Sequence, residues 1–86
     1  MSCEVLVLYF AKSSELTGVR SETLKVPQEI TSQQLWDRIV HFHPSLCAIR
    51  NQVVLAVCQE YVAIGEEMLT LKTGDEVAVI PPISGG

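Results

Sequence analysis

The sequence predicts an α+β domain in which one main helix packs across a mixed sheet of four to five strands. The order of elements supports this class, because two strand patterns come first, one helical pattern follows and several strand patterns return. The first and last strand patterns, residues 5–10 and 76–80, are the most apolar and are therefore candidates for neighbouring central strands. If they pair in parallel through the crossover after the first hairpin, the architecture is a β-grasp. Residues 1–80 would then form the domain and residues 81–86 an extended tail.

The first strand is expected over residues 5–10 (VLVLYF), because β-branched and aromatic residues favour extended backbone. A second strand is expected over residues 21–26 (SETLKV). Between them, residues 11–18 (AKSSELTG) have room for one short helical turn. Gly18 predicts its end, because glycine readily adopts the left-handed conformation that closes a helix.

Capping and periodicity predict the main helix. Thr31 is the expected N-cap, and Gln34 follows three residues later at the spacing of a capping box. The apolar residues of this helix recur at helical spacing and predict one face that covers a sheet: Leu35, Trp36, Ile39, Val40 and Phe42. The two aromatic residues among them are expected to anchor this face in the core.

The helix is expected to end by His43, because the residue before a proline disfavours helical backbone. The remaining elements are predicted as strands over residues 53–57, 61–64, 68–71 and 76–80, with a turn at residues 73–75. Cys58 is interpreted as a small hydrophobic residue of an apolar strand. Glu66 and Glu67 are expected in a solvated loop.

Composition narrows the classes of function. The 86 residues carry a formal charge of −4, and their six lysines and arginines are scattered, so nucleic acid is not an expected partner. The opening apolar run alternates like a strand and lacks a basic leader, which argues against a signal peptide or a membrane anchor. Cys3, Cys47 and Cys58 are odd in number and widely spaced, which fits reduced thiols. We therefore expect a soluble, cytosolic protein.

The carboxyl end is the strongest functional signal. Pro81 and Pro82 end the last strand and favour an extended segment, because proline cannot donate to a ladder and its φ is fixed. Six residues at roughly 3.3 Å each give a reach of about 20 Å. Gly85 and Gly86 lack side chains, so this end can thread a narrow channel and present an unhindered carboxyl group to an activating enzyme.

Other candidate sites are weaker. His41, His43 and Cys47 resemble a metal-binding group in residue type, but two histidines two residues apart point to different faces of a helix and no second ligand pair follows. A cysteine and histidine nucleophile pair lacks an identifiable third group that would orient it. We therefore predict no metal site and no active site within the domain.

Three segments carry a resemblance to a known family. They are VLYFAKSSELTG at residues 7–18, LAVCQEYV at residues 55–62 and TGDEVAVIPPISGG at residues 73–86. With them the chain resembles, over nearly its whole length, the small sulfur-carrier subunits of molybdopterin synthase, which have the ubiquitin-like β-grasp fold. Cys58 departs from the bacterial members, which often carry asparagine there.

The resemblance implies a sulfur carrier and not a catalyst. In this family the terminal glycine, here Gly86, is adenylated by a ubiquitin-activating-like enzyme that uses ATP and magnesium, and is then converted to a thiocarboxylate. The tail enters a large catalytic subunit, where the sulfur passes to cyclic pyranopterin monophosphate in molybdenum cofactor biosynthesis. The family implies a heterotetramer of two small and two large subunits, and no cofactor held stably by this chain.

Partner-binding residues are predicted from two sources. The exit of the tail places Ile80, Pro81 and Pro82 at the contact, and Ile83 and Ser84 lead on to the two glycines. The resemblance adds an apolar group at the ends of two strands, which consists of Phe10, Tyr61 and Val62. The alternative for Phe10 and Ile80 is a place in the core.

Two other functions stay open at this point. The first is a ubiquitin-like protein modifier, or a sulfur carrier for another pathway, that is conjugated or activated through Gly86. The second is a β-grasp binding module with an inert tail. The segment Pro81-Pro82-Ile83-Ser84 favours the synthase reading, because it lacks the arginine-rich approach that precedes the Gly-Gly of ubiquitin.

Overall fold

The computed structural model describes residues 1–81, apart from the side chains of Asn51 and Gln52. Its elements in chain order are β1 (Ser2–Tyr9), α1 (Lys12–Thr17), β2 (Ser21–Pro27), β3 (Glu29–Thr31), α2 (Ser32–Phe42), the 3-10 helix η1 (Pro44–Gln52), β4 (Val54–Val57), β5 (Glu60–Val62), β6 (Met68–Thr70) and β7 (Glu76–Ile80).

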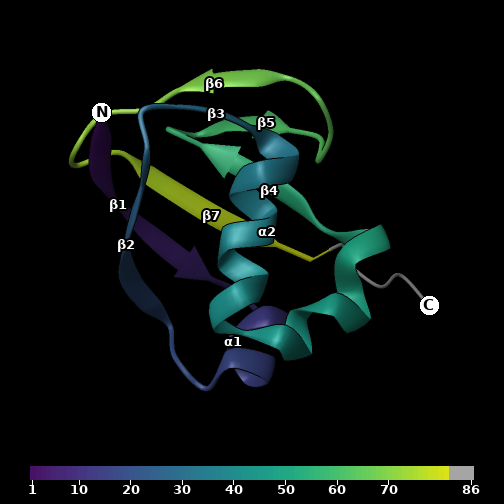
Figure 1. Ribbon diagram of the computed structural model, residues 1–86. Coiled ribbons are helices and arrows are strands. Elements are labelled where there is room, and N and C mark those ends of the chain that lie inside the picture. Colours follow the sequence, from purple (N-terminus) through teal and green to yellow (C-terminus); the bar gives the residue numbers. More distant parts are fainter. Residues whose placement is uncertain (82–86) are drawn as a thin grey trace.

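Five strands form one mixed sheet in the order β2-β1-β7-β4-β5, and α2 crosses one of its faces (Figure 1). The pair of β1 and β7 is parallel, and the other three pairs are antiparallel. Strands β3 and β6 make a separate two-stranded sheet. The parallel central pair, reached through a crossover that includes α2, is the arrangement of a β-grasp, so the predicted fold is confirmed.

Local signals in the sequence set the helix ends. The Thr31 hydroxyl accepts the Gln34 N–H at 3.1 Å, and the Gln34 side chain accepts the Thr31 N–H at 3.1 Å, which completes the predicted capping box. Gly18 closes α1 with φ of 78°, and its N–H donates to the Ser14 carbonyl. The C-cap of α2 is His43, as the following proline predicts.

The core lies between α2 and the face of the sheet that α2 covers. Trp36 is 1% exposed and anchors the helix, as predicted. The completely buried apolar side chains come from both layers: Val5, Val7, Leu35, Ile39, Leu46, Leu55, Val77 and Val79. Their burial removes the apolar stripe of α2 and the alternate residues of the strands from water, which is the main stabilising contribution to the fold.

Phe42 does not anchor the core, contrary to the prediction, because 58% of its surface is exposed. It is the last residue of α2, and its ring instead meets the ring of His41 edge to face. Helical periodicity predicted that Phe42 would fill this end of the core. Leu46 and Ile49 of η1 are buried there instead. The sequence analysis did not predict η1.

Cys58 was also placed wrongly, since it is exposed and follows β4 in a turn. Val57 pairs with Glu60, so Cys58 and Gln59 form a two-residue hairpin loop in which φ is 51° and 71°. Two positive φ angles are typical of a type I′ turn, which is favoured between antiparallel strands because its twist matches theirs.

Other boundaries shift by a few residues. Strand β1 begins at Ser2 and ends at Tyr9, so Phe10 lies just beyond it. Strand β5 is Glu60–Val62 and not residues 61–64, and β3 was missed because its three residues run directly into the N-cap of α2. Within residues 1–81, every helix is too short or too polar to span a bilayer.

Candidate functional site

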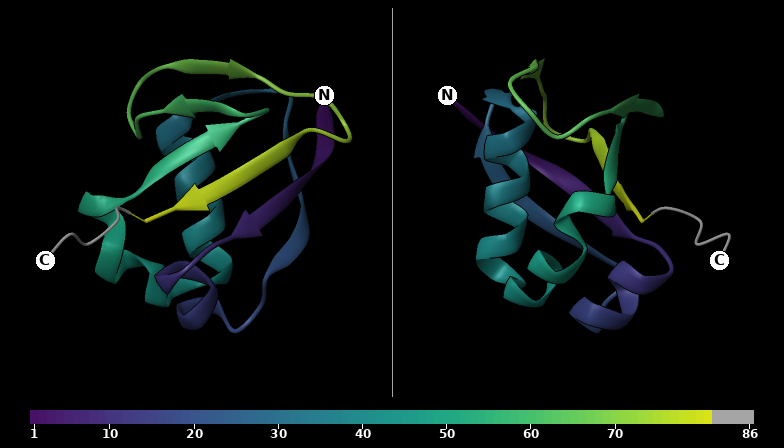
Figure 2. Two further views of the ribbon diagram at one scale, coloured as in Figure 1. Left: turned by 180° about the vertical axis from the view of Figure 1, so that it is seen from behind. Right: turned by 90° about the vertical axis from the view of Figure 1, so that its right-hand side faces the viewer.

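The candidate site surrounds the point where β7 ends and the carboxyl-terminal segment begins. Because β1 and β7 are parallel, both strands end at the same edge of the sheet (Figure 2). The last ladder pairs there are Tyr9 with Val79 and, on the other side, Val54 with Ile80. Pro81 follows directly and is buried. Pro82, Ile83, Ser84, Gly85 and Gly86 lie outside the described residues.

Two of the predicted partner-binding residues near this edge are apolar and accessible. Phe10 is 49% exposed, which places it outside the core. Tyr61 is 77% exposed on β5, the edge strand of the sheet. Ile80 is half-buried. Val62, by contrast, is buried with 6% of its surface exposed and pairs with Leu55, so its side chain belongs to the core and only supports its neighbour Tyr61.

The open face of the sheet, opposite α2, carries an apolar row that the sequence analysis missed. Pairing registers bring four residues side by side across the central strands: Leu8, Ala78, Ala56 and Tyr61. The pair of Ile80 and Val54 adds a second apolar row next to the exit, and Val54 is 38% exposed. Period-2 alternation was the signal that could have found Leu8, Ala78 and Tyr61, because each is less buried than a sequence neighbour, whereas Ala56 is itself buried.

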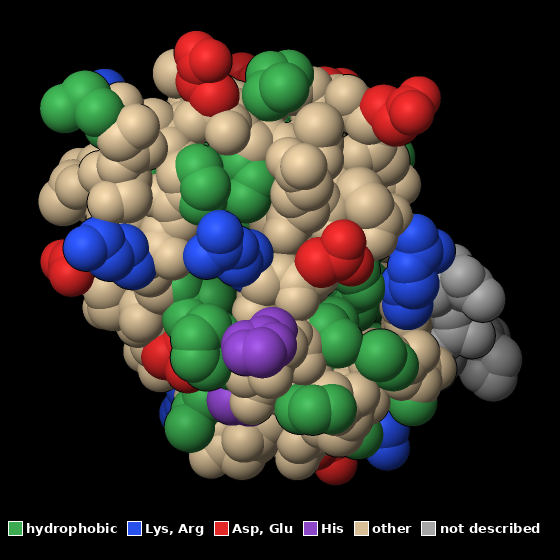
Figure 3. All heavy atoms as spheres, viewed as in Figure 1, with side chains coloured by type: hydrophobic (Ala, Val, Ile, Leu, Met, Phe, Trp, Pro, Cys, Tyr) green, Lys and Arg blue, Asp and Glu red, His purple; other side chains and the backbone are tan. Residues whose placement is uncertain are grey.

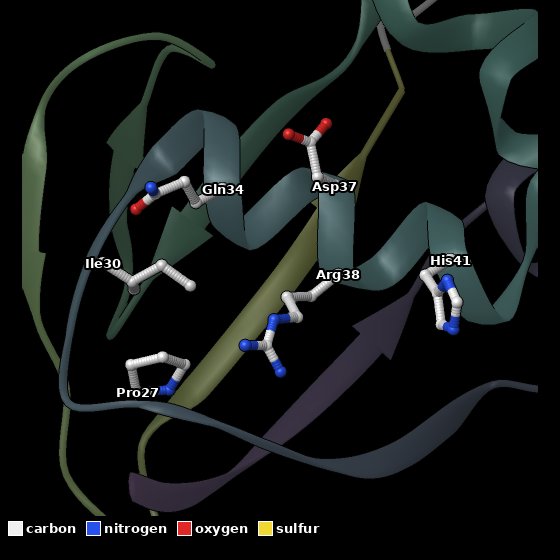
Figure 4. Close-up of a pocket in the computed structure, with 6 residues that line it drawn as sticks. All are labelled: Pro27, Ile30, Gln34, Asp37, Arg38 and His41. Carbon is white, nitrogen blue, oxygen red and sulfur yellow. The ribbon is translucent and has the colours of Figure 1, made fainter. Parts of the chain in front are cut away.

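The other side of the molecule has a different character. On the side of α2, Lys and Arg, Asp and Glu, and His side chains are scattered among separate hydrophobic patches (Figure 3). A hollow of about 530 Å³ lies between α2 and the connection from β2 to β3, and Arg38 extends toward Pro27 across it while Asp37 points away (Figure 4). Its position on the α2 side separates it from the open face, where the two apolar rows lie.

A polar contact joins Tyr9, at the end of β1, to Glu22 of β2 and to His43 at the end of α2. The Tyr9 hydroxyl donates to the Glu22 carboxylate, and the His43 imidazole contacts the same carboxylate oxygen. The Tyr9 and His43 rings meet edge to face with centroids 5.4 Å apart. Burial raises the pKa of Tyr9 well above its usual value, and the hydrogen bond and negative charge of Glu22 raise it further. The neutral phenol therefore ties β1 to β2 and to the C-cap of α2.

Metal ligands do not converge in the described part of the chain. Within residues 1–81, no group of three His, Cys, Asp or Glu side chains is arranged to hold a metal ion. His43 is engaged with Glu22, whereas Cys47 is exposed on η1.

Comparison with known proteins gives a consistent result. The model of the ThiS family matches residues 7–86. A human protein named molybdopterin synthase sulfur carrier subunit is 63% identical over 84 residues, which are 98% of this chain and 96% of that protein.

Solved structures agree with the topology. A putative molybdopterin converting factor, subunit 1, from Pyrococcus furiosus has a TM-score of 0.77 at 30% identity, covering 94% of this chain and 99% of its own. SAMP1 from Haloferax volcanii, a small archaeal modifier protein, has a TM-score of 0.78 at 27% identity, covering 96% of this chain and 99% of its own.

Proposed function

The chain belongs to the ThiS family, and on that basis we propose that it is the sulfur carrier subunit of molybdopterin synthase, with Gly86 as the carrier residue. The observation that carries this proposal is the placement of the exit. Strand β7 ends beside an open apolar face and precedes a terminal Gly-Gly in the sequence, which suits a protein that docks and delivers its own carboxyl end.

The chemistry begins with a poor electrophile, the terminal carboxylate. One of its oxygens attacks the α-phosphorus of ATP on an activating enzyme, and pyrophosphate leaves with magnesium neutralising its charge. A hydrosulfide equivalent then attacks the acyl adenylate, AMP leaves, and Gly86 becomes a thiocarboxylate. ATP and magnesium belong to the activating enzyme, and the chain contributes only the acyl group.

The thiocarboxylate then meets the large catalytic subunit, which binds cyclic pyranopterin monophosphate and receives the sulfur. The open face supplies the contact, with Phe10, Tyr61 and Ile80 around the exit as apolar anchors. Two small and two large subunits make up the proposed assembly. The three free cysteines favour a reducing compartment, so we place the protein in the cytosol.

A second function is favoured by one specific observation, the likeness to a small archaeal modifier protein. In that case the activated Gly86 is transferred to a lysine amine of another protein, and an isopeptide bond forms in place of the thiocarboxylate. Both functions use the same activated carboxyl group, so the product and not the activation step distinguishes them.

The test is intact mass spectrometry of the chain purified from cells with an active molybdenum cofactor pathway. The sulfur carrier gives a species heavier by the difference between sulfur and oxygen, mapped to the terminal peptide. Deletion of Gly86, or addition of one residue after it, removes this species because the acyl group is lost or moved out of register. A terminal peptide found only as free carboxylate, or only in branched lysine adducts, contradicts the sulfur carrier function.

A further inference from the structure

The turn that follows β1 has a strained backbone. Ala11 has φ of 51° and ψ of −126°, and the Ser13 N–H donates to the Phe10 carbonyl at 3.1 Å, so residues 10–13 form a tight turn. These angles match the first central position of a type II′ turn, which favours glycine because a Cβ is crowded there. The structure therefore holds Ala11 in an unfavourable conformation directly beside the exit of the carboxyl-terminal segment.

The side chain of Ser13 holds this turn together. Ser13 is completely buried, although it is a serine of a short helix at the edge of the molecule. Its hydroxyl oxygen accepts the Phe10 N–H at 2.9 Å. Its Oγ also lies within donating distance of two carbonyl oxygens, that of Phe10 at 2.7 Å and that of Val79 at 3.2 Å. One hydroxyl group thus joins the turn after β1 to the end of β7.

The contact with Val79 lies at the point where the pairing of β1 with β7 ends. Tyr9 and Val79 are the last pair of that ladder, and β1 ends at Tyr9. Strand β7 continues to Ile80, whose partner Val54 is on the opposite side. Pro81 has no N–H with which to extend either ladder. On the β1 side, Ser13 therefore makes the final hydrogen bond that β7 receives among the described residues.

We propose that Ser13 is a positioning residue for the transfer chemistry. It sets the direction in which β7 passes into the carboxyl-terminal segment, and it holds Phe10 beside the end of β7. This inference rests on the proposed function. Five residues follow Pro81 and span at most about 17 Å when extended. Ile80 and Pro81 lead into the residue that is activated, and a 1 Å misplacement of a reacting group can cost about 100-fold in rate.

The test compares Ser13→Ala with Ser14→Ala in the full chain. Ser14 is a matched control, because its hydroxyl also donates to a carbonyl of the same turn, that of Ala11 at 2.8 Å, but does not reach β7. Adenylation by the activating enzyme is followed as pyrophosphate release over a range of carrier concentrations. We expect Ser13→Ala to lower kcat by about tenfold or more and to change KM by less than about twofold, because Ser13 is completely buried and offers no surface of its own to the enzyme. Ser14→Ala should match the wild type.

Two further measurements distinguish a positioning role of Ser13 from a purely structural one: kcat in a stabilised background and the backbone dynamics of β7. Ser13→Ala is measured a second time in a Gln59→Gly background, which relieves the strain of a side chain at φ of 71° in the hairpin loop and so restores part of any lost stability. The kcat defect should persist there. The ¹⁵N order parameter of the Ile80 amide should fall in Ser13→Ala and not in Ser14→Ala. Wild-type kcat in Ser13→Ala, recovery of kcat in the stabilised background, or equal defects in the two variants would overturn the proposal.

A wild-type chain that the activating enzyme does not adenylate contradicts the proposed function instead. The order parameter then decides the geometric inference alone. A fall at Ile80 that is confined to Ser13→Ala supports the role of Ser13 in directing β7, and an unchanged value overturns it.

Discussion

The two faces of the five-stranded sheet are built from alternate residues of the same strands but have different surroundings. On one face Val79 and Leu55 are completely buried beneath α2. On the other, their sequence neighbours Ala78 and Ala56 lie in a row that ends at the exposed Tyr61. The first face stabilises the fold. On the second face, apolar side chains of neighbouring strands are aligned, and none of the described elements packs over them. We propose this face as the docking surface, because burial against a partner would remove the exposed part of its apolar surface from water.

The largest expected effect comes from breaking the covered face. Leu55→Ala removes a completely buried side chain from the core and should lower the free energy of unfolding by about 3 kcal/mol, because both transfer energy and packing are lost. Urea denaturation measures this change. The affinity of the folded fraction for the large subunit should stay within about twofold of the wild type, and a loss of binding comparable with the loss of stability would contradict the division between the faces.

A truncation on the open face should have the opposite effect, with little change in stability and a large loss of affinity. Tyr61→Ala is expected to change stability by less than about 0.5 kcal/mol, because the side chain is 77% exposed, but to weaken binding of the large subunit by about 2 kcal/mol, or roughly 30-fold in Kd. Isothermal titration calorimetry measures the affinity. Glu60→Ala is the control, since Glu60 is the exposed preceding residue of β5 and its side chain faces the other way.

A smaller effect should reveal the polar contact beneath β1. Tyr9→Phe removes the hydrogen bond to Glu22 and should lower stability at pH 7 by about 1.5 kcal/mol. The pKa of Tyr9 is raised in the folded state, so the unfolded chain loses this proton first, near pH 10, and the wild type should lose stability as pH rises above that value. Denaturation between pH 8 and about pH 11 should show a shallower decline in Tyr9→Phe. Parallel declines in the two proteins would contradict the proposed role of the phenol.

The smallest expected effect concerns the hairpin that fixes the register of β4 and β5. Gln59→Gly should stabilise the protein by about 0.5 kcal/mol, because glycine tolerates the φ of 71° without a Cβ penalty. Thermal denaturation followed by circular dichroism measures the shift in Tm. This register places Leu55 beneath α2 and Tyr61 on the open face, and a slip by one residue would exchange the faces of every side chain in β5. A lower Tm in Gln59→Gly would show that the glutamine side chain contributes a contact that outweighs the strain.

Sequence reasoning succeeded where the signals were local. The capping box at Thr31 and Gln34, the left-handed end at Gly18 and the apolar stripe around Trp36 each depend on residues within one or two turns of the chain. It failed where distant segments compete for the same space. Phe42 has the right spacing for the core, but η1 fills that place, and the positive φ of Cys58 follows from the strand pairing and not from its residue type.

The candidate site divides in the same way. The terminal Gly-Gly, the two prolines and the family resemblance were all visible in the linear sequence, and the comparisons confirm that resemblance. The apolar row across Leu8, Ala78 and Ala56 was not, although Leu8 and Ala78 alternate with buried residues. Alternation assigns residues to two faces, but it does not say which face a helix will cover.

The sequence by itself determined the order of the main elements, though not β3 or η1, the limits of the main helix and the terminal Gly-Gly, because capping, periodicity and proline act over a few residues. Only the tertiary structure decided that β1 and β7 end together, that Ser13 binds the end of β7 and that one apolar face stays open. These features join residues that are up to 70 positions apart, as in the β1–β7 pair of Tyr9 and Val79, so they form only when the packing of α2 and the sheet has brought both segments into place.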